Sequence, residues 1–325
     1  MERVLRRFRI QNQLVRECLA ESLGVYVLIL FGCGSAAQVT TSEERSGQYL
    51  SINLGFALGV TFGVFVSRGV SGAHLNPAVS LSLCVLGRHP WLKLPFYVVF
   101  QLLGAFLAAA TVALQYHDAI RSYAGGRLTV TGPRATAGIF STYPADYLSL
   151  WGGVVDQVIG TAALLLCLLA LGDQRNTSIP DGLQPVLVGS LVLVIGVSMG
   201  SNCGYPLNPA RDLGPRLFTY IAGGGADVFR SADVLHVQAF ILKGLHCYWF
   251  PQGWGGLVVG PHRRTLCWSS AGNSGVPADG RSPPPSPPPR EPGVLRGSLG
   301  IQDGAGGGAV PKKPVLRPPP PAADS

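Results

Sequence analysis

The chain has 325 residues, a formal net charge of +8 and a mean hydropathy of +0.31, with 47% hydrophobic and only 13% charged residues. Ordinary globular domains contain about 25% charged residues, and here the apolar residues form blocks long enough to cross a bilayer. The basic residues do not form the single basic face that a nucleic-acid partner would need. The composition therefore predicts an all-α, multi-pass membrane protein and argues against a soluble or nucleic-acid-binding one.

The sequence also argues against a metal- or cofactor-binding protein and against an enzyme. The seven cysteines show no Cys-x-x-Cys spacing, so neither a metal site, a disulfide framework nor a cofactor is expected. No arrangement of a nucleophile with a base is visible, so no enzyme activity is expected. The basic cluster that precedes the first apolar block indicates a cytosolic N-terminus at residues 1–17 by the positive-inside rule.

The first apolar half is expected over residues 18–115. Its second span is followed by a glycine-rich break and then by a helix too short to cross a membrane. The expected elements are three spans and one half-helix, at about 18–38, 50–67, the half-helix 76–87, and 94–114. A long polar stretch, residues 116–150, follows and is expected to be an extracellular loop.

The second half, residues 151–222, begins again in the same order. Its expected elements are two spans and a second half-helix, at about 151–171, 183–199 and the half-helix 208–221. Because three spans precede it, the second half enters the membrane with the opposite orientation, which predicts an inverted repeat.

A sixth span is missing from this pattern. In its place the atypical segment 223–274 contains Lys243 and Pro251 in its most apolar window, and a central lysine costs about 2.5–3.5 kcal/mol to insert. Residues 275–325 are rich in Pro and Gly, a composition expected to be disordered.

Two short segments nearly repeat each other, Gly72-Ala-His-Leu-Asn-Pro-Ala78 and Gly204-Tyr-Pro-Leu-Asn-Pro-Ala210. Each places an asparagine at the start of a half-helix, where free N–H groups and the helix dipole favour negative charge and repel cations. The irregular loops leave carbonyls free to accept hydrogen bonds along a path. The motif therefore predicts a pore, with the Asn-Pro-Ala triplets (Asn76, Pro77, Ala78, Asn208, Pro209, Ala210) at its centre and lining carbonyls from Gly72, Ala73, His74, Gly204 and Pro206.

The segments 69–79 and 208–216 match signatures of one family almost letter for letter. Over about residues 12–222 the chain resembles the major intrinsic protein (aquaporin) family, and more narrowly the vertebrate aquaglyceroporins of the aquaporin three, seven, nine and ten group. The resemblance implies two half-helices that meet at mid-membrane inside an inverted repeat.

The resemblance also assigns residue roles. It places the selectivity filter on Phe56, Gly196, Tyr205 and Arg211, and Gly196 stands where water-only relatives have His, which implies a wider opening. The marks of a glycerol-conducting channel fall on Asp212, Tyr116 and Arg216. Glu21 is expected to support the loop of the opposite half, with Gln157 as its counterpart, and His74 to brace its loop rather than to gate by pH.

These observations predict a passive channel for glycerol and water, with urea as a further solute, in the lipid bilayer of the plasma membrane. The family implies a homotetramer, and small residues of the third span, Gly104, Ala105, Ala108, Ala109 and Ala110, suit close helix packing. The main alternative is a non-conducting chain with an altered C-terminus, because one wall of the pore lacks its span. A secondary transporter would need mid-membrane carboxylates, for which only Glu21 and Asp156 are available.

Overall fold

The computed structural model describes residues 10–126, 128–173, 175–176 and 179–230, and all regular structure in these ranges is helical. The expected tail 275–325 and most of the segment 223–274, from residue 231 onward, lie outside the described residues. Within the described part, four helices are long and apolar enough to cross a membrane.

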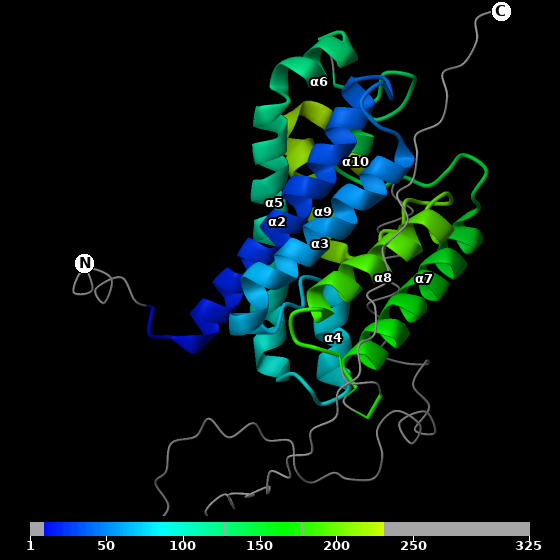
Figure 1. The fold of residues 1–325 in the computed structure, drawn as a ribbon. Coiled ribbons are helices and arrows are strands. Elements are labelled where there is room, and N and C mark those ends of the chain that lie inside the picture. The colour runs from blue at the N-terminus through cyan, green and yellow to red at the C-terminus, as the bar shows by residue number, and fades with distance from the viewer. Residues whose placement is uncertain (1–9, 127, 174, 177–178, 231–325) are drawn as a thin grey trace, which may run out of the picture. The chain divides into compact units, whose positions relative to one another are not determined.

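The first half contains three of these four helices and one half-helix. They are α2 (Gln13–Thr41), α3 (Tyr49–Ser71), the half-helix α4 (Pro77–Val85), and α5 (Leu94–Gln115). In Figure 1, α2 and α3 run side by side, and α4 lies in the lower part of the bundle. The expected spans and half-helix are therefore present, each within a few residues of its expected ends.

Small residues let the first-half helices approach closely. A Cβ added to Gly59 of α3 would lie 2.8 Å from the carbonyl oxygen of Leu28 on α2, and one added to Gly104 of α5 would collide with the carbonyl oxygen of Ser22. Ala105, Ala108 and Ala109 are fully buried. The small residues of α5 thus pack inside this chain, so they give no support to a contact between subunits.

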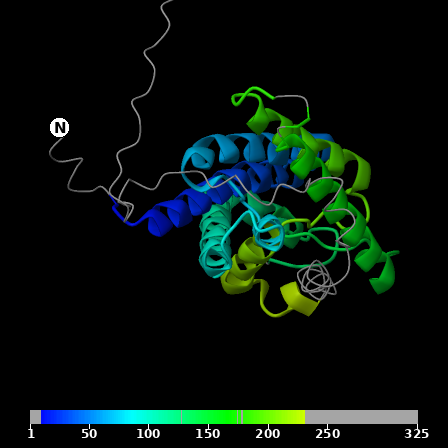
Figure 2. The ribbon, with the colours of Figure 1, turned by 90° about the horizontal axis from the view of Figure 1, so that it is seen from below.

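The second half repeats this order with α7 (Leu150–Leu171), α8 (Gln184–Met199) and the half-helix α9 (Pro209–Thr219). Helix α8 has only 16 residues, about 24 Å at 1.5 Å per residue, which is short of the roughly 30 Å hydrocarbon core. Seen along the bundle in Figure 2, α7 and α8 pair on one side, opposite α5.

The stretch 116–150 is more ordered than its polar sequence predicts. It contains α6 (His117–Ala124) and a 3₁₀ turn (Ala137–Ile139), and Ile139, Phe140 and Thr142 are buried. The short apolar run that begins at Ala137 folds back against the bundle, because its side chains find apolar surface there.

The chain leaves α9 through a π-helical turn (Tyr220–Gly224) in which Gly223 adopts φ +116°, a conformation that favours glycine. A short helix, α10 (Asp227–Arg230), follows, and Val228 within it is fully buried. The expected half-helix 208–221 therefore ends as an α-helix at Thr219, two residues early.

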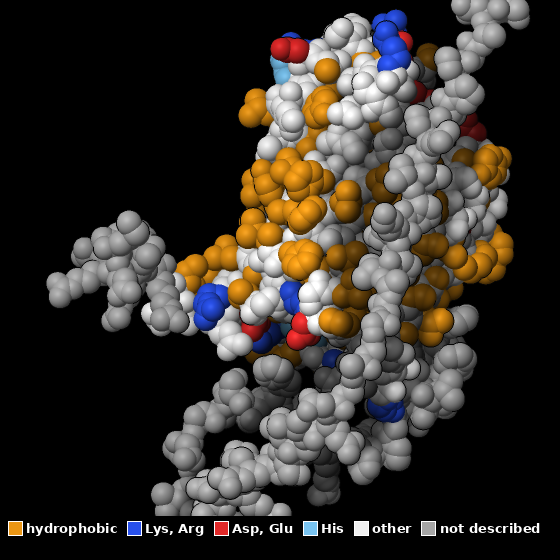
Figure 3. Space-filling view, in the orientation of Figure 1, with side chains coloured by type: hydrophobic (Ala, Val, Ile, Leu, Met, Phe, Trp, Pro, Cys, Tyr) orange, Lys and Arg blue, Asp and Glu red, His pale blue; other side chains and the backbone are white. Residues whose placement is uncertain are grey.

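The surface agrees with a membrane-spanning chain. On the face drawn in Figure 3, hydrophobic side chains cover the middle, and charged side chains gather toward the two ends. A stripe on α3 is 41–54% exposed, formed by Leu54, Leu58, Phe62 and Phe65. Such exposed apolar area is stable against lipid and would be costly in water.

Candidate pore and its constriction

The two repeated asparagines are the N-caps of the half-helices. The side-chain oxygen of Asn76 accepts from the backbone N–H of Ala78 at 2.8 Å, and that of Asn208 accepts from Ala210 and Arg211 at 3.0 and 3.2 Å. A proline follows each asparagine at the first helical position, where a missing N–H costs no hydrogen bond. Each triplet thus fixes the start of its helix.

The same asparagines also join the two halves. Nδ2 of Asn76 donates to the carbonyl of Leu207 at 3.0 Å, and Nδ2 of Asn208 donates to the carbonyl of Leu75 at 2.7 Å. These two bonds bring the positive ends of both half-helices to one level. Each amide group has two N–H bonds, so one N–H of each asparagine remains for a solute.

The loops before the half-helices adopt backbone conformations that are rare for residues other than glycine. Gly72 and Gly204 have φ +87° and +71°, and Ala73, Leu75 and Tyr205 have φ between +43° and +54°. Strained conformations of this kind persist only where the surroundings hold them, and they concentrate at functional sites. Here they belong to the loops that carry the expected pore carbonyls.

A cavity of about 260 Å³ runs past these loops. Gly72, Ala73 and His74 line it, whereas Gly204 and Pro206 lie outside its lining within the described residues. The lining also includes the expected filter positions Phe56, Tyr205 and Arg211, both repeated asparagines, the polar residues Arg68, Arg88 and Gln184, and apolar residues of α3, α7 and α8 such as Val60, Val64, Leu164, Leu168, Val188 and Val192. Both asparagines and Arg211 therefore share one cavity with many aliphatic side chains.

Arg211 and Phe56, two of the expected filter positions, contact each other in the cavity lining. The guanidinium carbon of Arg211 lies 4.3 Å from the centroid of the Phe56 ring, and Nη1 donates to the carbonyl of Phe140 at 3.1 Å. Phe56 packs on Gly32, where an added Cβ would collide with the ring. The Nε–H of Arg211 is buried without a partner in the described part of the chain, so a solute would reach this cation at its Nη atoms.

Gly196 and Tyr205, the other two expected filter positions, lie against each other. A Cβ added to Gly196 would lie 3.0 Å from Cζ of Tyr205, so the ring lies directly on the bare helix. Gly196 itself does not line the cavity among the described residues. A side chain at this position would collide with Asn53 and press on the Tyr205 ring.

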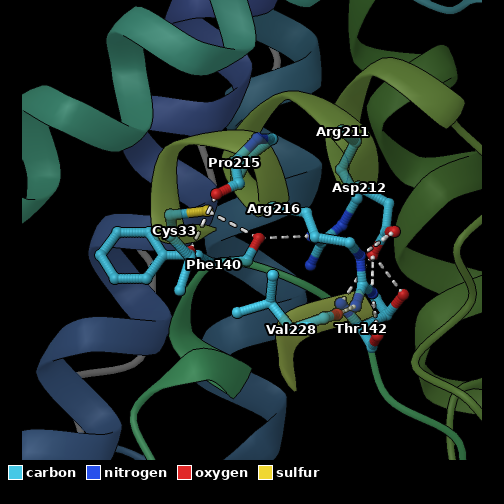
Figure 4. A network of polar contacts seen from close by, with 9 residues as sticks. Cys33, Phe140, Thr142, Arg211, Asp212, Pro215, Arg216 and Val228 are labelled. Carbon is cyan, nitrogen blue, oxygen red and sulfur yellow. Dashed lines mark hydrogen bonds and ion pairs between the residues drawn. The ribbon is translucent and has the colours of Figure 1, made fainter. Parts of the chain in front are cut away.

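Asp212 and Arg216 lie behind the constriction in a fully buried ion pair (Figure 4). Nε of Arg216 donates to Asp212 at 3.0 Å, and Asp212 accepts from the backbone N–H and the hydroxyl of Thr142 at 2.8 and 2.6 Å. Arg216 also donates to the carbonyls of Thr142 and Val228 at 2.5 and 2.6 Å. The two residues expected as glycerol-type marks thus tie the loop and α10 to α9, and neither they nor Tyr116 line the cavity in the described structure.

Phe140 and Thr142 were not expected from the sequence, although both support the constriction. The carbonyl of Phe140 holds Arg211 and also accepts a weak bond from the Cys33 thiol at 3.7 Å. The one signal in the sequence was the apolar run Ala137–Phe140 within a polar stretch. Apart from the Thr142 hydroxyl, backbone groups make these contacts, so side-chain identity alone does not reveal most of them.

Glu21 supports a loop, but that loop belongs to its own half. Its carboxylate accepts from the backbone N–H groups of His74 and Leu75 at 2.9 and 2.7 Å, from Ser71 Oγ at 2.6 Å and from Gln101 Nε2 at 2.8 Å. The expectation that it supports the opposite half is wrong, because the first-half loop returns directly over α2. His74 is braced in the same way, with Nδ1 at 3.0 Å from Ser80 Oγ.

Gln157 takes the matching place in the second half. Its Nε2 lies 2.7 Å from the sulfur of Cys203 and 3.3 Å from Asp156. Cys203 belongs to the second-half loop, so Gln157 also contacts the loop of its own half. The neighbouring Asp156 supplies a carboxylate to the same loop, where it accepts from Nδ2 of Asn202 at 2.7 Å and from the thiol of Cys203 at 2.8 Å.

We expect Glu21→Gln to lower the thermal midpoint of the purified chain in detergent by about 4–10 °C. An amide has one acceptor oxygen where the carboxylate has two, so buried donors lose their partner at about 1.5–3 kcal/mol. The matched control is Glu43→Gln, whose carboxylate is exposed and forms only a 3.6 Å surface pair. Equal midpoints for both variants would contradict the role given to Glu21.

The fold and the cavity define the class of this protein: a multi-pass membrane channel built from an inverted repeat, with two half-helices that meet in the pore. The chain belongs to the major intrinsic protein family, whose model matches residues 9–254. The match extends past residue 222, where the sequence resemblance was expected to end. Membership of this family supports a channel rather than an enzyme.

Individual relatives agree with this assignment. The chain is 55% identical to human aquaporin-10 over 230 residues, which are 71% of this chain and 76% of the relative. It is 47% identical to human aquaporin-9 over 255 residues (78% and 80% of the two chains) and 51% identical to mouse aquaporin-7 over 224 residues (69% and 74%). The X-ray structure of the aquaglyceroporin from Plasmodium falciparum superimposes with a TM-score of 0.62 at 34% identity, covering 72% of this chain and 90% of that one. The resemblance to aquaglyceroporins is therefore confirmed.

Proposed function

We propose that the chain is a passive channel for glycerol and water. The observation that carries this proposal is a cavity whose lining combines both Asn-Pro-Ala asparagines and Arg211 with many aliphatic side chains. Glycerol presents hydroxyl groups along one edge of its carbon backbone and CH groups along the other. A solute of this kind can contact polar and aliphatic lining at once, so little is lost when it sheds its water.

Selectivity against cations follows from the same geometry. Two half-helix N-termini face one level of the pore, and Arg211 adds a full positive charge nearby. A cation or a hopping proton meets this field in a narrow site with little water to screen it. Neutral solutes are not repelled by this field. Urea, which has carbonyl and N–H groups for hydrogen bonding, is therefore a further candidate solute.

The assembly and location follow from the family resemblance. We place the chain in the plasma membrane as a homotetramer with a cytosolic N-terminus, so that Arg211 lies toward the outer mouth. Exposed apolar side chains on the outer surface, such as those of α3, can face either lipid or another subunit. The mass of the detergent-purified particle distinguishes a tetramer from a monomer.

Uptake of labelled glycerol into cells that display the intact chain at their surface tests the proposal. We expect uptake several times that of control cells. The competing hypothesis, a non-conducting chain, predicts control-level uptake at equal surface display. In that case reading the coding sequence past codon 222 in other frames would locate a displaced apolar span.

We expect Arg211→Ala to raise the proton leak of reconstituted vesicles by at least about three-fold, because one full charge is removed from a poorly screened site. Glycerol permeability should remain within about three-fold of the parent. Arg45→Ala is the control, since this side chain is 79% exposed and is not among the residues that line the cavity. A proton leak identical to the parent would contradict the role given to Arg211.

A further inference from the structure

Tyr205 stands in the constriction on an unusual backbone. Its φ is +43°, and Gly204 before it has φ +71°. Residues other than glycine occupy this region at a cost and remain there only where contacts hold them. The position of the Tyr205 ring is thus decided by what the ring touches.

Close contacts with two glycines and one hydrogen bond hold the ring. A Cβ added to Gly196 of α8 would be 3.0 Å from Cζ, and one added to Gly200 would be 2.9 Å from Cδ1. The Tyr205 hydroxyl donates to Oδ1 of Asn53 at 2.7 Å. Gly196 provides the space and Asn53 provides the directional bond.

The hydrogen bond to Tyr205 offers a reason for the burial of the Asn53 amide. Asn53 is a polar side chain on the apolar helix α3, only 1% exposed, and it does not line the cavity in the described structure. Its Nδ2 has no hydrogen-bond partner among the described residues. A buried amide with unused donors costs free energy that an apolar side chain would not. In the described structure, Oδ1 of Asn53 accepts the hydrogen bond from the Tyr205 hydroxyl.

We propose that Asn53 is a positioning residue for solute size: it holds the Tyr205 ring against Gly196 and so keeps the constriction wide enough for glycerol. This inference rests on the proposed function. The ring lines the cavity together with Phe56 and Arg211. Once released from Asn53, it rotates toward them and narrows the opening, which obstructs glycerol more than water.

The test compares glycerol and water permeability in vesicles for the parent, Asn53→Leu, Tyr205→Phe and the double variant. Leucine keeps the size of asparagine but removes the acceptor, and phenylalanine removes only the hydroxyl. We expect both single variants to lower the glycerol-to-water ratio by about three- to ten-fold, as the loss of one hydrogen bond would. The double variant should resemble the singles, because both remove the same bond.

Tyr26→Phe is the matched control. Tyr26 lies on the apolar helix α2, its hydroxyl donates to Oγ1 of Thr111 at 3.1 Å, and neither residue lines the cavity in the described structure. Removal of the Tyr26 hydroxyl should leave the ratio unchanged. A general structural defect would lower both permeabilities together and would leave their ratio intact.

Each outcome decides between the alternatives. Parent vesicles that conduct glycerol while both single variants keep the parent ratio would overturn the role of Asn53 and leave the proposed function standing. Additive effects in the double variant would also overturn it. Parent vesicles that pass water but no glycerol would overturn the proposed function itself. Tyr205→Phe removes a single oxygen atom, so it keeps the test decisive if Asn53→Leu fails to fold.

Discussion

Gly196→His should lower the glycerol permeability of reconstituted vesicles by at least about ten-fold while water permeability changes by less than about three-fold. A Cβ at this position already meets Oδ1 of Asn53 at 2.5 Å and Cζ of Tyr205 at 3.0 Å. The imidazole therefore displaces the Tyr205 ring into the opening. A ten-fold loss corresponds to about 1.4 kcal/mol at the barrier, a modest cost for excluding a carbon backbone from a narrowed site. Stopped-flow light scattering measures both permeabilities on one preparation.

Gly69→His is the control for this substitution. Gly69 also lies on a pore-forming helix, but nothing is within 4 Å of a Cβ added there. Its permeabilities should equal those of the parent. Equal loss of glycerol and water in Gly196→His, with correctly folded protein, would count against the constriction assigned to Gly196 and Tyr205.

Asp212→Asn should destabilise the chain by about 3–5 kcal/mol, because it leaves the buried charge of Arg216 without its partner. Both side chains are completely inaccessible to solvent, and together they hold Thr142 and Val228 (Figure 4). We expect aggregation on extraction, or a thermal midpoint lowered by more than about 10 °C in detergent. The intensity of the monodisperse peak in size-exclusion chromatography reports the folded fraction.

Removing both charges separates the pair from its surroundings. Asp212→Asn combined with Arg216→Met should be less destabilised than Asp212→Asn alone, since no unpaired charge remains buried. The exposed pair Arg45–Glu43, 3.6 Å apart, provides the comparison, and breaking it should cost under about 1 kcal/mol. A double variant no more stable than the single would show that Arg216 is held by its carbonyl partners rather than by Asp212.

The parts of this fold that the sequence predicted are those encoded locally. Apolar blocks, glycine breaks and the Asn-Pro-Ala starts of the half-helices each act within a few residues, and α2, α3, α4, α5, α7 and α9 lie close to where these signals place them. The filter positions came from the family resemblance. The structure then brings Phe56, Tyr205 and Arg211 to one cavity.

The parts that the sequence did not predict depend on contacts between distant segments. Phe140 holds Arg211 through a backbone carbonyl, which any residue could supply. Asn53 appeared to be one polar residue in an apolar span, and its partner lies 152 positions away. Glu21 was assigned to the wrong half. A carboxylate within an apolar span indicates that hydrogen-bond donors lie nearby, but the sequence does not show which loop provides them.

The most direct test of the central claim is stopped-flow glycerol flux in vesicles that contain the purified 325-residue chain. If this cavity conducts glycerol, vesicles with the parent chain should equilibrate glycerol at least about ten-fold faster than protein-free vesicles. Vesicles with the Gly196→His chain should show a much smaller increase in this rate. Glycerol flux equal to that of protein-free vesicles, from chain that elutes as a single folded species, would contradict it.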